Sequence, residues 1–256
     1  MPEIVIVTPE DAGAWWRVTL GGSKGNILDA ALMDALIDVF ENARRVPTLK
    51  AIVLEGAGPH FSYGASVEEH LPDRVERMFQ RFGRLLRAVL DSDVVVLAAV
   101  RGQCLGGGLE LVTLAHRVFA TGDAKFGQPE IALGVFPPAA SVLLPGRIGR
   151  AHAEELCLTG RVIAAREANA MGLVDDIVDG DPAEAALAWA RAHFTAKSAS
   201  SLRQAVRAVR LGLADRLRLD LPRVEQIYLE DLMQTADAAE GLHAFLEKRQ
   251  PEWTHR

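Results

Sequence analysis

VVVLAAVRGQCLGGGLE, residues 94–110, is the stretch that carries most information about the fold. Its first seven residues form an apolar run, which predicts a buried strand. The glycines at 106–108 allow the backbone to approach a ligand closely, because they carry no Cβ. Helix-favouring residues from Leu109 to Ala115 place these glycines at a helix N-terminus. Unpaired N–H groups and the positive end of the helix dipole favour developing negative charge there.

Two glutamates stand beside turns of this kind. Glu110 follows Gly107 by three residues, so we expect it near the same face of the helix. Glu130 ends the segment KFGQPE, directly after Pro129. Taken singly, Glu110 is explained as a helix carboxylate satisfied by nearby donors, and Glu130 as a first-turn residue favoured by the dipole. A carboxylate beside an oxyanion-binding amide is, however, what addition of water to an activated double bond requires.

Strand and helix patterns alternate along most of the chain, which predicts an α/β fold with crossover connections. Strands are predicted at 4–7, 16–20, 51–54 and 94–100, with a turn at Pro9 and Gly13 after the first. Helices are predicted at 30–45, capped by Asp29, and at 74–90. From about Asp181 the pattern is wholly helical, with helices expected at 182–193, 198–213, 215–234 and 238–248.

Bulk composition limits the classes of function. The 256 residues are 49% hydrophobic, which suffices for a sizeable core in one or two domains. A formal net charge of −6 argues against broad nucleic-acid binding, which needs a basic face. The apolar run at 94–100 is too short to span a bilayer, and the N-terminus lacks the features of a signal peptide. Cys104 and Cys157 provide neither metal spacing nor a disulfide framework, so we expect a cytoplasmic protein without a metal site.

Several short patterns have competing interpretations. GGSKG at 21–25 matches the nucleophile pattern of serine hydrolases, but four residues separate it from the next helix, and a flexible turn is the ordinary explanation. The glycines at 56 and 58 follow a strand, but Phe61 stands where a dinucleotide loop needs its third glycine. The histidines with no metal-ligand spacing are expected to be loop or packing residues: His60, His70 and His116.

Several motifs in one order resemble the enoyl-CoA hydratase/isomerase (crotonase) superfamily. They are FSYGAS at 61–66, RGQCLGGGLE at 101–110, FGQPE at 126–130, LTGR at 158–161, AMGLV at 170–174 and EGLHAFLEKR at 240–249. The resemblance extends from about Arg17 to Pro251. It implies a spiral of β-β-α repeats over residues 1–195. It also implies a C-terminal helical region over 196–256 that completes the coenzyme A site and forms a homotrimer or homohexamer.

The resemblance also implies the site and its chemistry. The N–H groups of Ala65 and Gly107 would hold the enolate oxygen of an acyl-CoA thioester. Glu110 and Glu130 would hold a water molecule, one acting as base and the other as proton donor, which favours a hydratase over an isomerase. Coenzyme A is part of the substrate, and no further cofactor is needed. Contacts to coenzyme A and substrate are predicted for Lys24, Ser66, Val67, Phe245 and Lys248, although Lys24 is equally well explained as a solvated lysine.

The chain departs from the ordinary pattern beside the acyl pocket, which we assign to Phe136, Pro137 and Pro138. The segment FPPAASVLLP at 136–145 stands where common members have PGAGGTQR, so Pro138 replaces a glycine and lacks an N–H donor. Ser66 stands where aspartate is usual. Together with SYGASVEEHLP at 62–72, this segment resembles the cyclohexa-1,5-diene-1-carbonyl-CoA hydratases of anaerobic aromatic degradation.

That narrower resemblance implies addition of hydroxide at the β-carbon and protonation at the far end of an extended dienolate. The product would be 6-hydroxycyclohex-1-ene-1-carbonyl-CoA. Three alternatives remain open. They are a general short-chain enoyl-CoA hydratase, a crotonase-type isomerase or thioester hydrolase, and a non-catalytic CoA-binding assembly protein.

Overall fold

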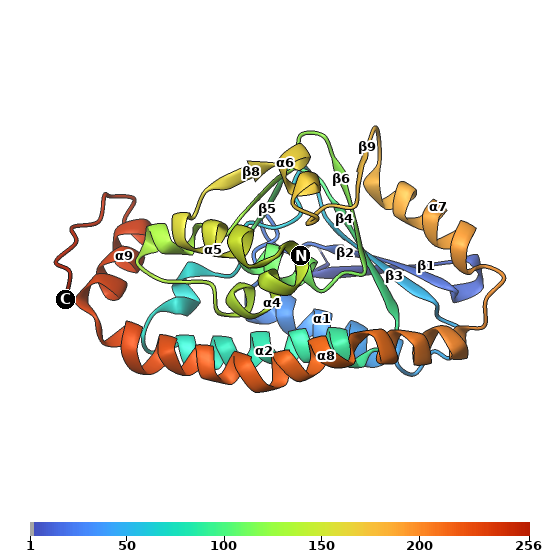
Figure 1. Ribbon diagram of the computed structural model, residues 1–256, viewed down its shortest axis with the longest axis horizontal. Helices are drawn as coiled ribbons and strands as arrows, with labels where there is room; N and C mark the ends of the chain where they lie inside the picture. Colours follow the sequence, from blue (N-terminus) through green and yellow to red (C-terminus); the bar gives the residue numbers. More distant parts are fainter. Residues whose placement is uncertain (1–2) are drawn as a thin grey trace.

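The computed structural model describes residues 3–256 and is built around two sheets (Figure 1). The larger sheet has the order β1-β2-β3-β4-β6-β9 and consists of β1 (Val5–Glu10), β2 (Trp15–Leu20), β3 (Ala51–Gly56), β4 (Val95–Val100), β6 (Arg117–Thr121) and β9 (Asp176–Val178). The smaller sheet has the order β5-β7-β8 and consists of β5 (Gln103–Leu105), β7 (Lys125–Gly127) and β8 (Val162–Ala164). In the larger sheet only β1 and β2 pair in antiparallel fashion, and the other pairs are parallel.

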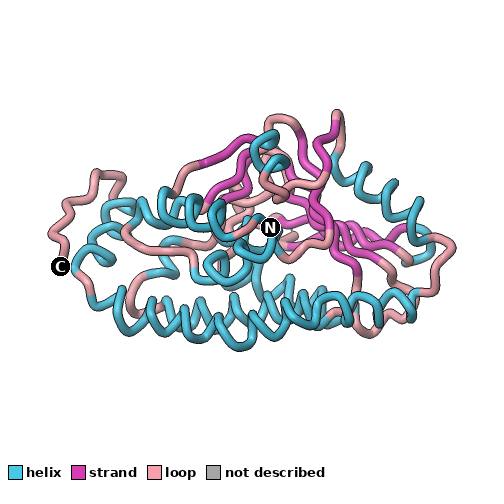
Figure 2. The backbone as a smooth tube through the Cα atoms, in the orientation of Figure 1, coloured by secondary structure: helices cyan, strands magenta, loops and turns pink. Residues whose placement is uncertain are grey.

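Helices cover both faces of the larger sheet (Figures 1 and 2). The α-helices are α1 (Ala30–Ala43), α2 (Val75–Asp91), α3 (Gly107–Thr113), α4 (Pro138–Ile148), α5 (Arg150–Thr159), α6 (Ala165–Ala170), α7 (Pro182–Phe194), α8 (Ala199–Gln226) and α9 (Ala236–Leu246). Short 3₁₀ segments are η1 (Asp11–Gly13), η2 (Val67–His70), η3 (Pro129–Leu133) and η5 (Leu232–Gln234), and η4 (Ile227–Asp231) is π-helical. None of the helices in residues 3–256 is long and apolar enough to cross a membrane.

The central strands β3 and β4 are buried along their whole length. Successive side chains of a strand point to opposite faces, so each strand supplies two cores. Ile52 and Leu54 join the main core with α1 and α2, whereas Val53 joins a second core with Leu187 of α7. Near-continuous apolar strands covered on both faces are typical of parallel sheets, and the predicted α/β fold class is confirmed.

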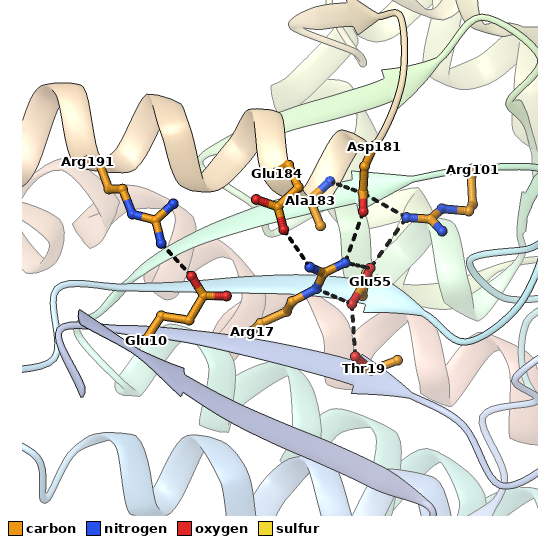
Figure 3. Close-up of polar contacts among 9 residues, drawn as sticks. All are labelled: Glu10, Arg17, Thr19, Glu55, Arg101, Asp181, Ala183, Glu184 and Arg191. Carbon is orange, nitrogen blue, oxygen red and sulfur yellow. Dashed lines mark hydrogen bonds and ion pairs between the residues drawn. The ribbon is translucent and has the colours of Figure 1, made fainter. Parts of the chain in front are cut away.

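A cluster of charged side chains fastens α7 to the sheet (Figure 3). Arg17 on β2 donates to the nearly buried carboxylate of Glu55 at 2.5 Å and to Asp181 at 3.1 Å. Arg101 donates to the same Asp181 at 2.8 Å, and Asp181 caps α7 by accepting from the Ala183 N–H at 2.9 Å. Because every charge has partners, this cluster holds the helix in place without leaving a carboxylate buried alone.

Two predictions of local structure are wrong. Residues 198–213 and 215–234 do not form separate helices, because α8 runs without interruption from Ala199 to Gln226 and is followed by η4 and η5. Asp215 was expected to begin the second helix, but it lies on the helix surface and pairs with Arg218. Pro9 does not form a turn either, since β1 continues to Glu10. β1 is an edge strand, and proline is tolerated there because its missing N–H can face the unpaired side of the strand.

The C-terminal helical region contains both buried and exposed leucines. Leu217 and Leu221 are buried against the main core, while Leu211 and Leu219 are 63% and 64% exposed. The subunit therefore buries only part of the leucine-rich face of α8. The division into residues 1–195 and 196–256 stays a prediction.

Candidate active site

A cavity of about 650 Å³ lies between the first turns of α3 and α4, the segment 63–70, η3, and the helices α2, α8 and α9. This volume is in the range of small-molecule sites in proteins. Both predicted glutamates and both predicted oxyanion residues line it.

Gly106 and Gly107 form the turn into α3. Gly106 has φ 49° and ψ −127°, a conformation that side-chain-bearing residues rarely adopt, and its N–H donates to Gly127 of the small sheet at 3.0 Å. A Cβ placed on Gly107 would lie 3.2 Å from the Ala65 nitrogen, so the two backbone segments are in contact. Within residues 3–256, neither the Gly107 N–H nor the Ala65 N–H donates a hydrogen bond.

The segment around Ala65 is held by Leu28. The Leu28 N–H donates to the Gly64 oxygen at 2.9 Å, and the Ser66 N–H donates to the Leu28 oxygen at 3.4 Å. In such a parallel bridge the polar groups of the central residue point away from the partner. The Ala65 N–H is therefore turned away from Leu28, toward the side of the segment where Gly107 and the cavity lie.

Glu110 lies in the first turn of α3, which begins at Gly107 rather than at Leu109 as expected. Its side chain is 4% exposed, and its Oε1 accepts a hydrogen bond of 2.7 Å from the Ala140 N–H in the first turn of α4. Pro138 occupies the first position of α4 and has no N–H. An N–H at that position has no hydrogen-bond partner within the helix, so the proline does not weaken α4. Burial raises the pKa of Glu110, while the N–H groups of Ala140 and Ala139 lower it.

Glu130 lies in η3, after Pro129, and its carboxylate packs against Gly106. A Cβ on Gly106 would come within 2.6 Å of the Glu130 Oε1, so the glycine is what makes room for the acid. The fully buried Gln128, with its amide nitrogen turned toward Glu130, lies 3.2 Å from both carboxylate oxygens. Burial raises the pKa of Glu130, and the charge of Glu110 raises it further. Such a pair shares a proton more readily than it ionises twice.

The remaining predicted contact residues fall into two groups. Ser66, Val67, Phe245, Phe136, Pro137 and Pro138 all line the cavity. Lys24 and Lys248 are exposed and are not among the residues that line it, whereas Arg249 is. The structure thus brings together every predicted site residue except these two lysines.

Sequence reasoning missed three polar residues of this region. Gln128 contacts Glu130, although its only signal was its place two residues before that acid. His70 was expected to be a loop or packing residue, but it lines the cavity from η2 with its Nδ1 2.8 Å from the Ser66 oxygen, and burial lowers its pKa. Glu225 reaches the cavity from α8, where the helical pattern of the sequence does not distinguish a site residue from a surface glutamate.

The structure distinguishes between the competing interpretations of the short patterns. Ser23 is exposed and its Oγ accepts from the Ile27 N–H at 2.9 Å, as expected of a turn residue. No helix opens after Gly58, and His116 packs against β4 with a hydrogen bond from the Val96 N–H. Cys104 is buried, which raises the pKa of its thiol. Residues 3–256 contain no group of three or more His, Cys, Asp or Glu side chains placed to hold a metal ion.

The profile of the family described as Enoyl-CoA hydratase/isomerase matches residues 16–256. The chain belongs to this family. It is 49% identical over 247 residues to cyclohexa-1,5-dienecarbonyl-CoA hydratase of Thauera aromatica, a match that covers 96% of this chain and 95% of that protein. It is 38% identical over 257 residues to a probable enoyl-CoA hydratase of Rhizobium meliloti strain 1021, covering 96% and 97% of the two chains.

The fold agrees with solved members of the family. The crystal structure of an enoyl-CoA hydratase from Mycobacterium avium superposes with a TM-score of 0.87 at 27% identity, covering 99% of this chain and 100% of that one. The family, the crotonase fold and the enzyme class predicted from the sequence, a hydratase, are confirmed.

Proposed function

We propose that this enzyme adds water to cyclohexa-1,5-diene-1-carbonyl-CoA and forms 6-hydroxycyclohex-1-ene-1-carbonyl-CoA. The observation that carries the proposal is the convergence of two carboxyls, the buried Glu110 and the half-buried Glu130, and two unpaired backbone N–H groups on one cavity. The 49% identity to the Thauera aromatica hydratase supports the cyclic diene as the substrate.

The chemistry follows from these groups. The ionised member of the Glu110–Glu130 pair takes a proton from a bound water, and the water oxygen forms a bond to the β-carbon of the diene. The electron pair moves onto the thioester oxygen, where the Ala65 and Gly107 N–H groups stabilise it. A single donor of this kind contributes about 3–4 kcal/mol to the transition state. The dienolate then takes up a proton at its far end, which completes the addition of one water.

The acyl pocket suits a flat ring. Phe136, Pro137 and Pro138 form one part of the wall, and Phe79 and Phe82 of α2 face the same cavity. The two prolines restrict the backbone, and Pro138 stands where common family members carry glycine, so the wall cannot readily adapt to a flexible acyl chain. Pocket shape of this kind discriminates between substrates by about 1–3 kcal/mol.

The test is a steady-state comparison of purified enzyme on two thioesters. We expect kcat/KM for cyclohexa-1,5-diene-1-carbonyl-CoA to exceed that for crotonyl-CoA by at least ~10-fold, corresponding to the discrimination just given. A preference for crotonyl-CoA would instead assign the chain as a general short-chain enoyl-CoA hydratase.

The coenzyme A contacts and the assembly belong to the same proposal. Phe245 on α9, which is 53% exposed, and Arg249 line the outer part of the cavity wall, where the coenzyme portion of the thioester would lie. The exposed Leu211 and Leu219 of α8 are apolar surface that a second subunit would cover, in keeping with a homotrimer or homohexamer. Sedimentation of the purified enzyme tests the assembly, and a stable monomer at micromolar concentration would contradict it.

A further inference from the structure

A third carboxyl group, that of Glu225, faces the cavity from the apolar wall rather than from the polar wall that carries Glu110 and Glu130. The wall formed by α2 and α8 is apolar, with Met78, Phe82 and Leu221 along it, but it also carries Glu225. Within residues 3–256, the Glu225 side chain makes no hydrogen bond and no ion pair. Glu225 is partly buried, and partial loss of solvent from an unpaired carboxyl in an apolar wall carries an energetic cost.

The local packing explains how Glu225 reaches the cavity. Its Oε1 lies 3.7 Å from where a Cβ on Gly83 would be, an ordinary van der Waals distance, so the carboxyl lies directly against α2. The Arg87 guanidinium lies on the same stretch of α2, with Nη1 3.2 Å from that Cβ position, yet it forms no ion pair with Glu225. The Glu225 carboxyl therefore lies near the Arg87 guanidinium but does not form an ion pair with it.

Glu225 is suited to hold a proton near neutral pH. Burial raises its pKa to about 7, although the positive charge of Arg87 acts in the opposite direction. The charge of Glu225 also raises the pKa of Glu110, so the two carboxyls are within electrostatic range of each other. The other titratable groups that line the cavity are Glu130 on η3, Glu68 and His70 on η2, Tyr63 and Arg249. The buried Tyr228 on η4 packs against Phe79 and Phe136 of the cavity wall.

Neither His70 nor Tyr228 can replace Glu225 as a proton source. Burial lowers the pKa of His70, so its ring is neutral. If its Nδ1 donates to the Ser66 oxygen, Nε2 is left as an acceptor. Burial raises the pKa of Tyr228, which makes its buried hydroxyl a weaker acid. Glu225 is thus the carboxylic acid of the α2–α8 wall, whereas the other carboxyl that is not engaged with the water, Glu68 on η2, is exposed to solvent.

The proposed reaction needs a base at one place and an acid at another. Hydroxide adds to the carbon at one end of the four-carbon diene, and the proton adds to the carbon at its other end, which lies directly across the six-membered ring. Groups that hold the attacking water lie beside the carbon that becomes hydroxylated. They are therefore on the opposite side of the ring from the carbon that must be protonated. A general acid must lie within hydrogen-bond reach of the atom it serves.

We propose that Glu225 is the catalytic acid that protonates the distal ring carbon, an assignment that rests on the proposed function. The O–H bond of the neutral Glu225 carboxyl breaks, a C–H bond forms at the distal carbon, and the electron pair of the dienolate returns from the thioester oxygen. Glu225 is left ionised, and the Glu110–Glu130 pair holds the proton taken from water. Exchange of one proton with solvent at each site restores the starting state, so the sum is addition of one water.

The test uses Glu225→Gln, which keeps the shape of the side chain and removes the acid. We expect kcat for cyclohexa-1,5-diene-1-carbonyl-CoA to fall by ~100-fold, the lower range for a positioned acid. Crotonyl-CoA hydration by the same variant should change less than ~3-fold, because that reaction is protonated at the α-carbon and does not need the distal acid. Asp220→Asn, an exposed carboxyl of the same helix paired with Arg223, is the matched control and should leave both activities unchanged.

The outcomes separate the two hypotheses. If the unmodified enzyme does not hydrate the cyclic diene, the proposed function fails and the role of Glu225 fails with it. If the unmodified enzyme is active and Glu225→Gln retains its full rate on the diene, only the role of Glu225 is overturned. An equal loss on both thioesters also overturns it, since that result indicates a general structural effect.

Discussion

The two sides of the cavity are built in different ways. The side formed by α3 and η3 carries Glu110, Glu130 and the Gly107 N–H within one short stretch of chain, where glycines fix the backbone. The side formed by α2 and α8 is assembled from segments far apart in the sequence, and its character is apolar except for Glu225. In this account the first side activates the water and stabilises the enolate oxygen, whereas the second side contributes apolar wall for the acyl group and the acid that protonates the distal ring carbon.

The largest effect is expected from the two glutamates of the polar side. Glu110→Gln and Glu130→Gln should each lower kcat at least ~100-fold, because each removes a positioned acid or base. KM for the CoA thioester should change little, since neither carboxyl is assigned to binding. Steady-state hydration rates provide the measurement. Glu230→Gln, an exposed glutamate that accepts from Gln226, is the matched control. Near-normal turnover of both active-site variants would show that the two carboxyls do not carry the reaction.

A smaller loss is expected from crowding the oxyanion amides. A Cβ on Gly64 would lie 2.9 Å from the Leu105 oxygen and 3.2 Å from the Gly107 nitrogen, so Gly64→Ala should displace the Gly107 donor. We expect kcat to fall by roughly 10- to 100-fold, less than the loss for complete removal of one such donor. Gly58→Ala is the control, because Gly58 also has positive φ but no neighbour within 4 Å of its Cβ position. Equal losses in the two variants would indicate backbone strain rather than damage to the oxyanion site.

The smallest effect is a pH-dependent gain in stability. Burial raises the pKa of Glu130 above its ordinary value of 4.5, so the folded enzyme retains a proton that the unfolded chain releases. Stability from this group is therefore full below about pH 4.5 and is lost as pH rises. Glu130→Gln removes this loss. Its Tm should exceed that of the unmodified enzyme by a few degrees at pH 8.5 and by less at pH 5.5. Melting curves at the two pH values check this, and a gap that widens toward acid would have the wrong sign.

Features set by local sequence were predicted well from the chain. The buried strand over 94–100, the glycine turn into α3, and Glu130 after Pro129 all follow from neighbouring residues and occur within two residues of the expected positions. The continuous helix α8 was not predicted, because an aspartate on a helix surface and one at a helix start look alike in sequence. The small sheet β5-β7-β8 was also missed, since its three-residue strands are too short to show a period.

The same distinction holds for the site. Family motifs placed six of the eight contact and pocket residues at the cavity, and the two exceptions, Lys24 and Lys248, are exposed side chains whose direction no motif fixes. Glu225 could not be found in this way, because only the packing of α8 against Gly83 of α2 brings it to the cavity.

The most direct test of the proposed reaction is hydration of cyclohexa-1,5-diene-1-carbonyl-CoA in deuterated water, followed by NMR analysis of the product. The proposed mechanism predicts one deuterium on the ring carbon across from the hydroxylated carbon, because the dienolate is protonated at its far end. Deuterium found only on the carbon that bears the thioester carbonyl would contradict it and would instead indicate ordinary enoyl-CoA hydration.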